Sequence, residues 1–127
     1  MKRFYSSILS LFLLCLCSCK FDADDSKGAL VVRNSSGDAD VYISAVYAKG
    51  EDASGWQLVW SGKISSGSSE FIELDKGSYS VRIITENSLF EPFLSAQSYE
   101  TGYNVYKTLK EDDFLNVEFD GSGIYFS

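Results

Sequence analysis

The stretch "SYSVRIITE", residues 78–86, alternates polar and apolar side chains from Ser78 to Ile83. Tyr79, Val81 and Ile83 fall on one face of an extended chain, and polar residues occupy the positions between them. A period of two residues is typical of a β-strand that has one face in a core. The stretch therefore predicts a half-buried strand, and the fold class depends on whether its neighbours share the pattern.

The neighbouring segments also indicate strands, because from residue 28 onward short strand-like runs are separated by clusters of Gly, Ser, Asn and Asp. The best candidate for a helix, residues 87–96, is interrupted by Pro92. We therefore predict an all-β fold, a single antiparallel β-sandwich of about seven to eight strands over residues 28–127. The expected strands are residues 28–34, 39–49, 56–62, 70–75, 78–86, 98–109, 114–119 and 124–127.

Residues 64–83, "ISSGSSEFIELDKGSYSVRI", combine a glycine-serine turn, a strand and a glycine-x-tyrosine turn into the next strand. This order resembles a passage common in prealbumin-like and carboxypeptidase-regulatory-like β-sandwiches. Lys76 departs from the proline or alanine usual in that family. The resemblance implies a sandwich fold and no particular activity, since its motifs mark turns. The matching positions are Gly67, Phe71, Leu74, Gly77 and Tyr79.

The N-terminus has the features of an export signal. Lys2 and Arg3 precede an apolar block of about ten residues, against the roughly 20 that cross a bilayer as a helix. A cationic head, a short apolar middle and small residues at the exit indicate a secretory signal peptide over residues 1–18.

The tetrapeptide Leu16-Cys17-Ser18-Cys19 resembles the lipobox of bacterial lipoproteins, although Cys17 departs from the usual alanine, serine or threonine. The resemblance implies cleavage between Ser18 and Cys19, with diacylglyceryl modification of Cys19. Membrane lipid would then be a partner through the acylated Cys19, and no thiol would remain for a disulfide, because Cys15 and Cys17 leave with the signal. Lys20, in place of an aspartate, is similar to outer-membrane sorting sequences; the periplasmic face and the cell surface both stay open.

Residues 19–27 are polar and acidic, which predicts a flexible tether between the anchor and the sandwich. After removal of Lys2 and Arg3, 9 basic residues stand against 18 acidic ones, a net charge of −9. Such a charge argues against nucleic acid as a partner, because phosphates are bound by Lys and Arg.

Catalysis is not expected. The chain has no histidine, and its mature form would have no free thiol, which removes Ser-His-Asp and Cys-His chemistry and the usual zinc ligands. A hydrolase with paired carboxylates would need two acids that converge on a cleft. The acids Glu111, Asp112 and Asp113 are expected in a solvated loop. We therefore predict neither an enzyme nor a cofactor or metal.

Two groups of apolar residues are possible contacts for a ligand or partner. Trp56 and Trp60 are four apart and, with Leu58, would share one face of a strand. Core packing is the expected use of the tryptophans, and stacking on sugar rings is the alternative. A second group would close one end of the sandwich or, if exposed, form a partner patch. Its members are Leu89, Phe90, Phe93 and Leu94.

These observations predict a lipid-anchored protein of the cell envelope, whose sandwich is a non-catalytic structural or protein-interaction module. The alternative is a surface lipoprotein that binds a glycan or small ligand through exposed aromatic residues.

Overall fold

The computed structural model describes residues 27–90, 95–102 and 105–127. The predicted signal peptide, the lipidation site and tether residues 19–26 lie outside the described residues. The last residue assigned to the tether, Lys27, is the first residue of a strand. In the part of the chain that the structure describes, no helix is long and apolar enough to span a membrane.

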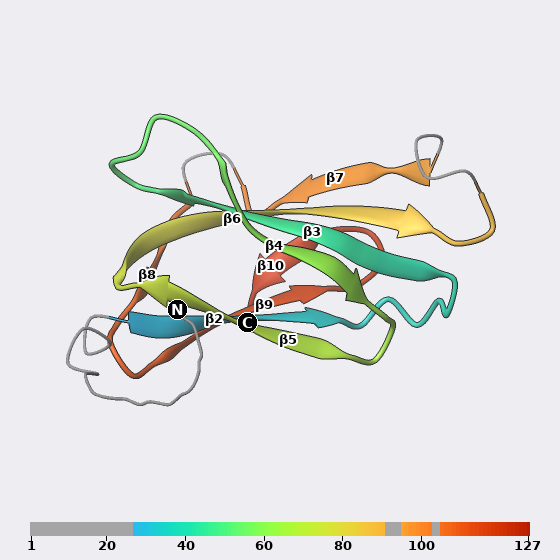
Figure 1. Cartoon of the computed structure of the whole chain (residues 1–127), viewed down its shortest axis with the longest axis horizontal. Helices are drawn as coiled ribbons and strands as arrows, with labels where there is room; N and C mark the ends of the chain where they lie inside the picture. Colours follow the sequence, from blue (N-terminus) through green and yellow to red (C-terminus); the bar gives the residue numbers. More distant parts are fainter. Residues whose placement is uncertain (1–26, 91–94, 103–104) are drawn as a thin grey trace, which may run out of the picture.

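The prediction of an all-β sandwich is confirmed. Two sheets form the two layers in Figure 1, and nearly all strand neighbours are antiparallel. Nine strands lie within the described residues: β2 (Lys27–Asn34), β3 (Val41–Gly50), β4 (Gln57–Ile64), β5 (Ser69–Asp75), β6 (Gly77–Asn87), β7 (Gln97–Glu100), β8 (Lys107–Leu109), β9 (Phe114–Phe119) and β10 (Ile124–Phe126).

One layer is a four-stranded sheet in the order β10-β9-β2-β5, and the other is a five-stranded sheet in the order β4-β3-β6-β7, with β8 also paired to β6. One pair of neighbouring strands departs from the antiparallel arrangement, because β2 and β9 run parallel. Parallel neighbours need a long crossover connection. Here the chain supplies it by building the whole five-stranded sheet and β5 between β2 and β9.

The single strand expected at residues 98–109 is wrong, since two short strands, β7 and β8, replace it. β7 pairs with residues Arg82 to Thr85 of β6, and β8 pairs with residues Gly77 to Tyr79. The chain leaves β6 between them at Gly102, whose φ of 130° is a backbone conformation open to glycine. Tyr99 packs against the core, whereas Val105 is 44% exposed, so the two do not share a buried face. Tyr103, expected on that face, lies outside the described residues.

The core lies between the two sheets and follows the alternation of the strands. Val81 and Ile83 of β6 are fully buried, as the period of two predicts. They pack with the inward residues of the opposite layer. The buried members of the core are Leu30, Val32, Ile43, Val46, Ile64, Ile72, Val81, Ile83, Leu109, Leu115, Val117, Phe119 and Ile124.

Asn34, at the end of β2, is a fully buried polar residue that links the two sheets. Its amide nitrogen donates hydrogen bonds to the carbonyl oxygens of Val41 (3.1 Å) and Ile64 (3.0 Å), where β3 begins and β4 ends. Its amide oxygen accepts a hydrogen bond from the backbone N–H of Ser36 (3.1 Å). The two bonds to carbonyl groups join β2, in one layer, to strands of the other layer, and the bond from Ser36 holds the start of the loop that follows β2.

The turn between β9 and β10 is organised by one carboxylate. Asp120 Oδ1 accepts hydrogen bonds from the backbone N–H (2.9 Å) and hydroxyl (3.0 Å) of Ser122 and from the N–H of Gly123 (3.0 Å). These bonds stabilise the charged form and lower the pKa of Asp120, with the Ser122 N–H as the largest cause. The hairpin expected from "DGSG" is confirmed by the pairing of β9 with β10.

The lowered pKa of Asp120 predicts an acid-dependent loosening of this hairpin. Because the folded-state pKa lies below the unfolded one, the stabilisation is complete above the unfolded value of about 3.9 and is lost as the pH falls through the folded value. Carboxyl NMR titration should find Asp120 below that reference. The free-energy difference between wild type and Asp120→Ala should shrink as the pH falls in this range. A pKa at or above the reference would contradict the prediction.

Candidate interaction surfaces

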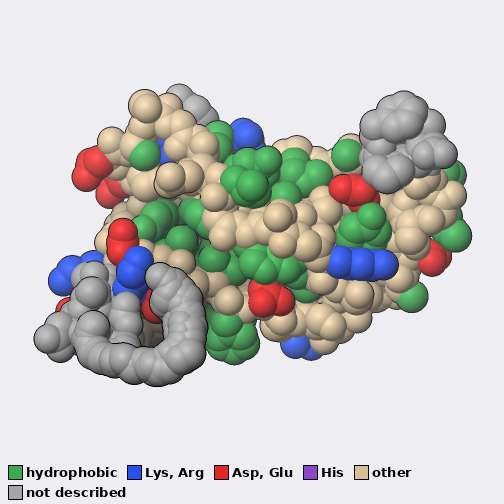
Figure 2. All heavy atoms as spheres, in the orientation of Figure 1, with side chains coloured by type: hydrophobic (Ala, Val, Ile, Leu, Met, Phe, Trp, Pro, Cys, Tyr) green, Lys and Arg blue, Asp and Glu red, His purple; other side chains and the backbone are tan. Residues whose placement is uncertain are grey.

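Two exposed phenylalanines meet on the outer face of the four-stranded sheet. The ring centroids of Phe71 and Phe114 are 5.8 Å apart, with the ring planes at 83°. Phe71 is 63% exposed and Phe114 is 58% exposed. Figure 2 shows hydrophobic side chains projecting at the lower edge of the molecule, below β5.

The strand order brings the two rings together. β2 lies between β5 and β9, and its outward residues Ala29 and Val31 pair with Phe114 and Phe71 respectively. Both β2 residues are half-buried, because the rings stand over them. We call Ala29, Val31, Phe71 and Phe114 the phenylalanine surface.

A shallow groove of about 450 Å³ adjoins the phenylalanine surface. Lys27, the one cationic residue among the described residues of its lining, is paired with Asp75 at 3.0 Å. Three carboxylates of the groove, from Glu73, Asp112 and Asp113, are exposed and form no ion pair with any described residue. The groove therefore combines an apolar wall with a negative rim. The lining residues are Lys27, Gly28, Ala29, Phe71, Glu73, Asp112, Asp113 and Phe114.

Within the described ranges, no group of three or more carboxylates is placed so that it could hold a metal ion. Asp113 accepts a hydrogen bond from the backbone N–H of Phe114 at 2.8 Å, so it also holds the start of β9.

The two tryptophans lie on opposite faces of the five-stranded sheet, which corrects the prediction that they share one with Leu58. In the pairing of β3 with β4, Val46 faces Trp60 and Tyr47 faces Leu58, so Val59 is an extra residue, a β-bulge. One extra residue reverses the alternation of side chains. Trp60 consequently packs against the core, whereas Leu58 is 52% exposed.

Trp56 is half-buried and lies beneath an arginine. The guanidinium carbon of Arg82 is 4.4 Å from the centroid of the Trp56 ring, a cation–π distance. Arg82 also donates two hydrogen bonds to Glu100 Oε2, from Nε (3.0 Å) and Nη2 (2.6 Å). One face of the indole is thus already occupied by a protein group.

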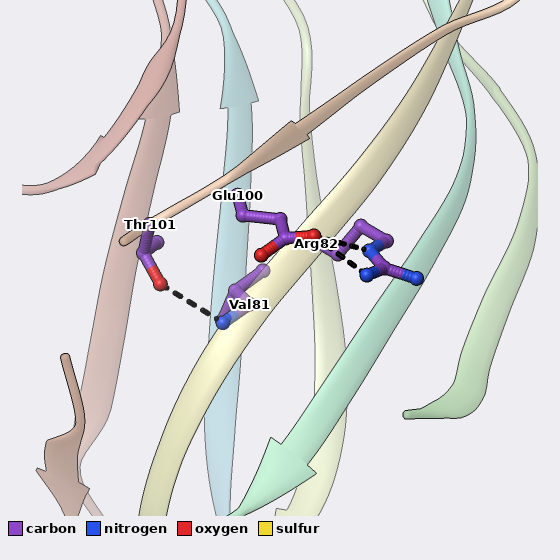
Figure 3. Close-up of polar contacts among 4 residues, drawn as sticks. All are labelled: Val81, Arg82, Glu100 and Thr101. Carbon is purple, nitrogen blue, oxygen red and sulfur yellow. Dashed lines mark hydrogen bonds and ion pairs between the residues drawn. The ribbon is translucent and has the colours of Figure 1, made fainter. Parts of the chain in front are cut away.

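Figure 3 shows that this ion pair sits beside a second link between β6 and the end of β7. The Val81 N–H donates to Thr101 Oγ1 at 3.1 Å, and the Thr101 N–H donates to the Val81 carbonyl at 3.0 Å. The cluster fastens β7, a strand of only four residues, to the sheet. Arg82, a member of this cluster, covers one face of the half-buried Trp56 ring.

Leu89 and Phe90 do not fold inward, which contradicts the prediction that their loop closes the sandwich with these two side chains. Leu89 is 69% exposed and Phe90 is 63% exposed. The other two members of the group, Phe93 and Leu94, lie outside the described residues. Phe90 instead stands at a cavity of about 450 Å³ at this end of the sandwich.

The phenylalanine surface was missed in the sequence, although the alternation of β5 contains the signal. Ile72 is buried and Leu74 packs against the core, so the strand phase places Phe71 on the outer face with Glu73. A large apolar residue on an otherwise polar face is the pattern that would have revealed it. Its partner, Phe114, could not be found this way, because the parallel pairing of β9 is not visible in the sequence.

No protein-family model matches the chain, and no curated protein matches it.

Proposed function

We propose that this chain is a bacterial lipoprotein of the cell envelope, acylated at Cys19 and held in the outer membrane, whose sandwich is a non-catalytic protein-interaction module. The order of cationic head, short apolar block and lipobox-like tetrapeptide supports the anchor. Two or more acyl chains give stable attachment, because each buried CH₂ contributes about 0.8 kcal/mol and a single chain is marginal.

The observation that carries the interaction role is the exposure of Phe71 and Phe114. The outer face of an antiparallel sheet is commonly polar. Here two phenyl rings, both more than half exposed, pack edge to face over the apolar residues of β2. Contiguous exposed apolar groups with a polar rim mark protein contact sites, and aromatic residues are enriched in the centre of such sites.

The charges around the rings define the chemistry of the partner. Glu73, Asp112 and Asp113 surround the apolar wall without a neutralising cation among the described residues, and the mature chain has a net charge of −9. Complementary potentials favour a protein segment in which Lys or Arg side chains flank an apolar one. The stem of such a side chain would lie on the phenyl rings and its charged head would reach the carboxylates.

The anchor limits where the partner can be. The span from Cys19 to Lys27 reaches about 30 Å at most, and Lys27 itself lines the groove. A partner that binds the phenylalanine surface is therefore near the bilayer, as an integral or lipid-anchored envelope protein would be.

The double substitution Phe71→Ser and Phe114→Ser should release the partner. Both residues are exposed and lie outside the core, so the fold should be retained while the apolar centre of the interface is lost. Loss of two aromatic anchors is expected to weaken binding by at least about 100-fold. Native electrophoresis of complexes solubilised from cells should then show the protein at the size of the free chain.

Leu58→Ser is the matched control, because Leu58 is an exposed apolar residue of the other layer. It should leave the complex intact. Complexes of equal size and abundance from the double variant and the wild type would refute a role for the phenylalanine surface in partner binding.

A further inference from the structure

At one end of the sandwich, β6 ends and β3 and β7 begin (Figure 1). The residues that line the cavity beside Phe90 include members of all three strands at this end. Its volume of about 450 Å³ is within the range of roughly 300–1,000 Å³ typical of small-molecule sites. Both sheets contribute to its wall, since Phe119 belongs to β9 and Thr85 to β6. The described lining residues are Val41, Thr85, Glu86, Asn87, Phe90, Ser95, Gln97, Tyr99, Phe119 and Gly121.

Thr85 is the residue that points to a ligand. It is 3% exposed, lies on the inward face of β6 with Ile83 and Val81, and lines the cavity. Its side-chain hydroxyl has no hydrogen-bond partner among the described residues, unlike the buried Asn34 amide. A buried hydroxyl without a partner is unfavourable, and a molecule that enters the cavity and bonds to it would remove that cost.

The walls around Thr85 combine aromatic and uncharged polar groups. The rings of Tyr99 and Phe119 pack at a centroid distance of 5.1 Å and an angle of 47°. Gln97 adds an exposed amide. Such a lining suits a molecule that has both an apolar face and hydroxyl groups.

The charge of the described lining disfavours anionic ligands. Glu86 is the only ionisable acid or base of the described lining other than the Tyr99 phenol. Its carboxylate accepts a hydrogen bond from the Tyr42 hydroxyl at 3.2 Å. Partial burial and the bond to Glu86 raise the pKa of Tyr42, so this hydroxyl remains a donor at neutral pH. A single carboxylate at the wall repels anions and tolerates neutral molecules.

We propose that this cavity is a binding site for an uncharged, hydroxyl-bearing ring, a single sugar unit being the representative case. The ring lies against Tyr99, and one of its hydroxyls pairs with Thr85. The site is separate from the phenylalanine surface and is carried by different residues, so its failure would leave the proposed partner binding untouched.

The test is an amide NMR titration of the full processed chain in micelles of a detergent without a sugar headgroup. D-glucose and N-acetyl-D-glucosamine are the probes, and D-glucuronate, which has a carboxylate in place of the glucose hydroxymethyl group, is the anionic control. At least one neutral sugar should shift the amides of Thr85, Gln97 and Tyr99 saturably at millimolar concentration, and glucuronate should bind more weakly.

Two variants separate binding from folding. Thr85→Val keeps the shape of the side chain and removes one hydrogen bond, so it should weaken sugar binding by about threefold to tenfold. Gln97→Ala changes an exposed residue and should weaken binding without disturbing the core. Absence of saturable shifts with both neutral sugars, glucuronate binding as tight as that of the neutral sugar that binds, or shifts confined to Trp56 would overturn the proposal.

Discussion

Replacing Asn34 with leucine is expected to lower the free energy of unfolding by about 2–4 kcal/mol, a large part of the roughly 5–15 kcal/mol of an ordinary domain. Leucine has a similar volume, so the change removes hydrogen bonds more than it opens a cavity. The carbonyl oxygens of Val41 and Ile64 lose a donor, and the N–H of Ser36 loses its acceptor. Urea unfolding followed by tryptophan fluorescence measures the effect.

Asn34→Asp should be at least as damaging, because a carboxylate oxygen would replace the nitrogen that donates to both carbonyl groups. Asn116→Leu is the matched control. Asn116 is an exposed asparagine of the neighbouring strand β9, and its substitution should change stability by no more than about 0.5 kcal/mol. Equal unfolding midpoints for Asn34→Leu and Asn116→Leu would show that Asn34 does not link the sheets.

Substitution of Cys19 by serine should abolish lipidation completely, because the lipobox-like motif has one position for the modified thiol. Cells grown with an alkyne-bearing fatty acid should label the wild-type protein and not the Cys19→Ser variant. The mass of the wild-type protein should correspond to residues 19–127 with acyl groups added. In bacterial lipoproteins cleavage follows modification, so on the proposed function the variant should keep residues 1–18.

Cys15→Ser and Cys17→Ser are the controls, since both positions fall inside the predicted signal. Each should label as strongly as the wild type. Labelling of the Cys19→Ser variant, or loss of label in the Cys17→Ser variant alone, would contradict the assignment of Cys19 as the acylated residue.

The alternation of side chains was sufficient to predict most of the strands. Residues 78–86 predict β6 because one face of the strand points into the core. Buried side chains therefore recur at every second position. The same signal marks β2, β3, β5 and β9 within one or two residues at each end. These strands are long enough for a periodic pattern to be clear.

Local irregularities were not predictable. The β-bulge at Val59 turns Trp60 to the core and Leu58 to solvent, although the tryptophan spacing alone indicates a shared face. Residues 98–109 contain two strands, β7 and β8, because each pairs with a different part of β6. Both features arise from pairing with a neighbouring strand, which the sequence of the segment itself does not contain.

The same reason explains why the candidate sites were only partly predicted. Phe71 and Phe114 meet because β2 enters between β5 and β9, a matter of sheet order. Thr85 lies in a run of alternating residues that predicts its burial, whereas its position beside a cavity depends on Phe119 from the other layer. The side of a strand on which one residue lies can be inferred from the alternation of its neighbours. Which strands far apart in the sequence lie side by side cannot be inferred in this way.

Site-specific photo-crosslinking in living cells tests the proposed interaction most directly. A photoreactive phenylalanine analogue would replace Phe71, Phe114 or, as the control on the other layer, Leu58. Irradiation should attach the same envelope protein at positions 71 and 114, through a segment that contains Lys or Arg beside an apolar residue, and not at position 58. No adduct at positions 71 and 114, or the same adduct at position 58, would contradict the assignment of the phenylalanine surface as the partner site.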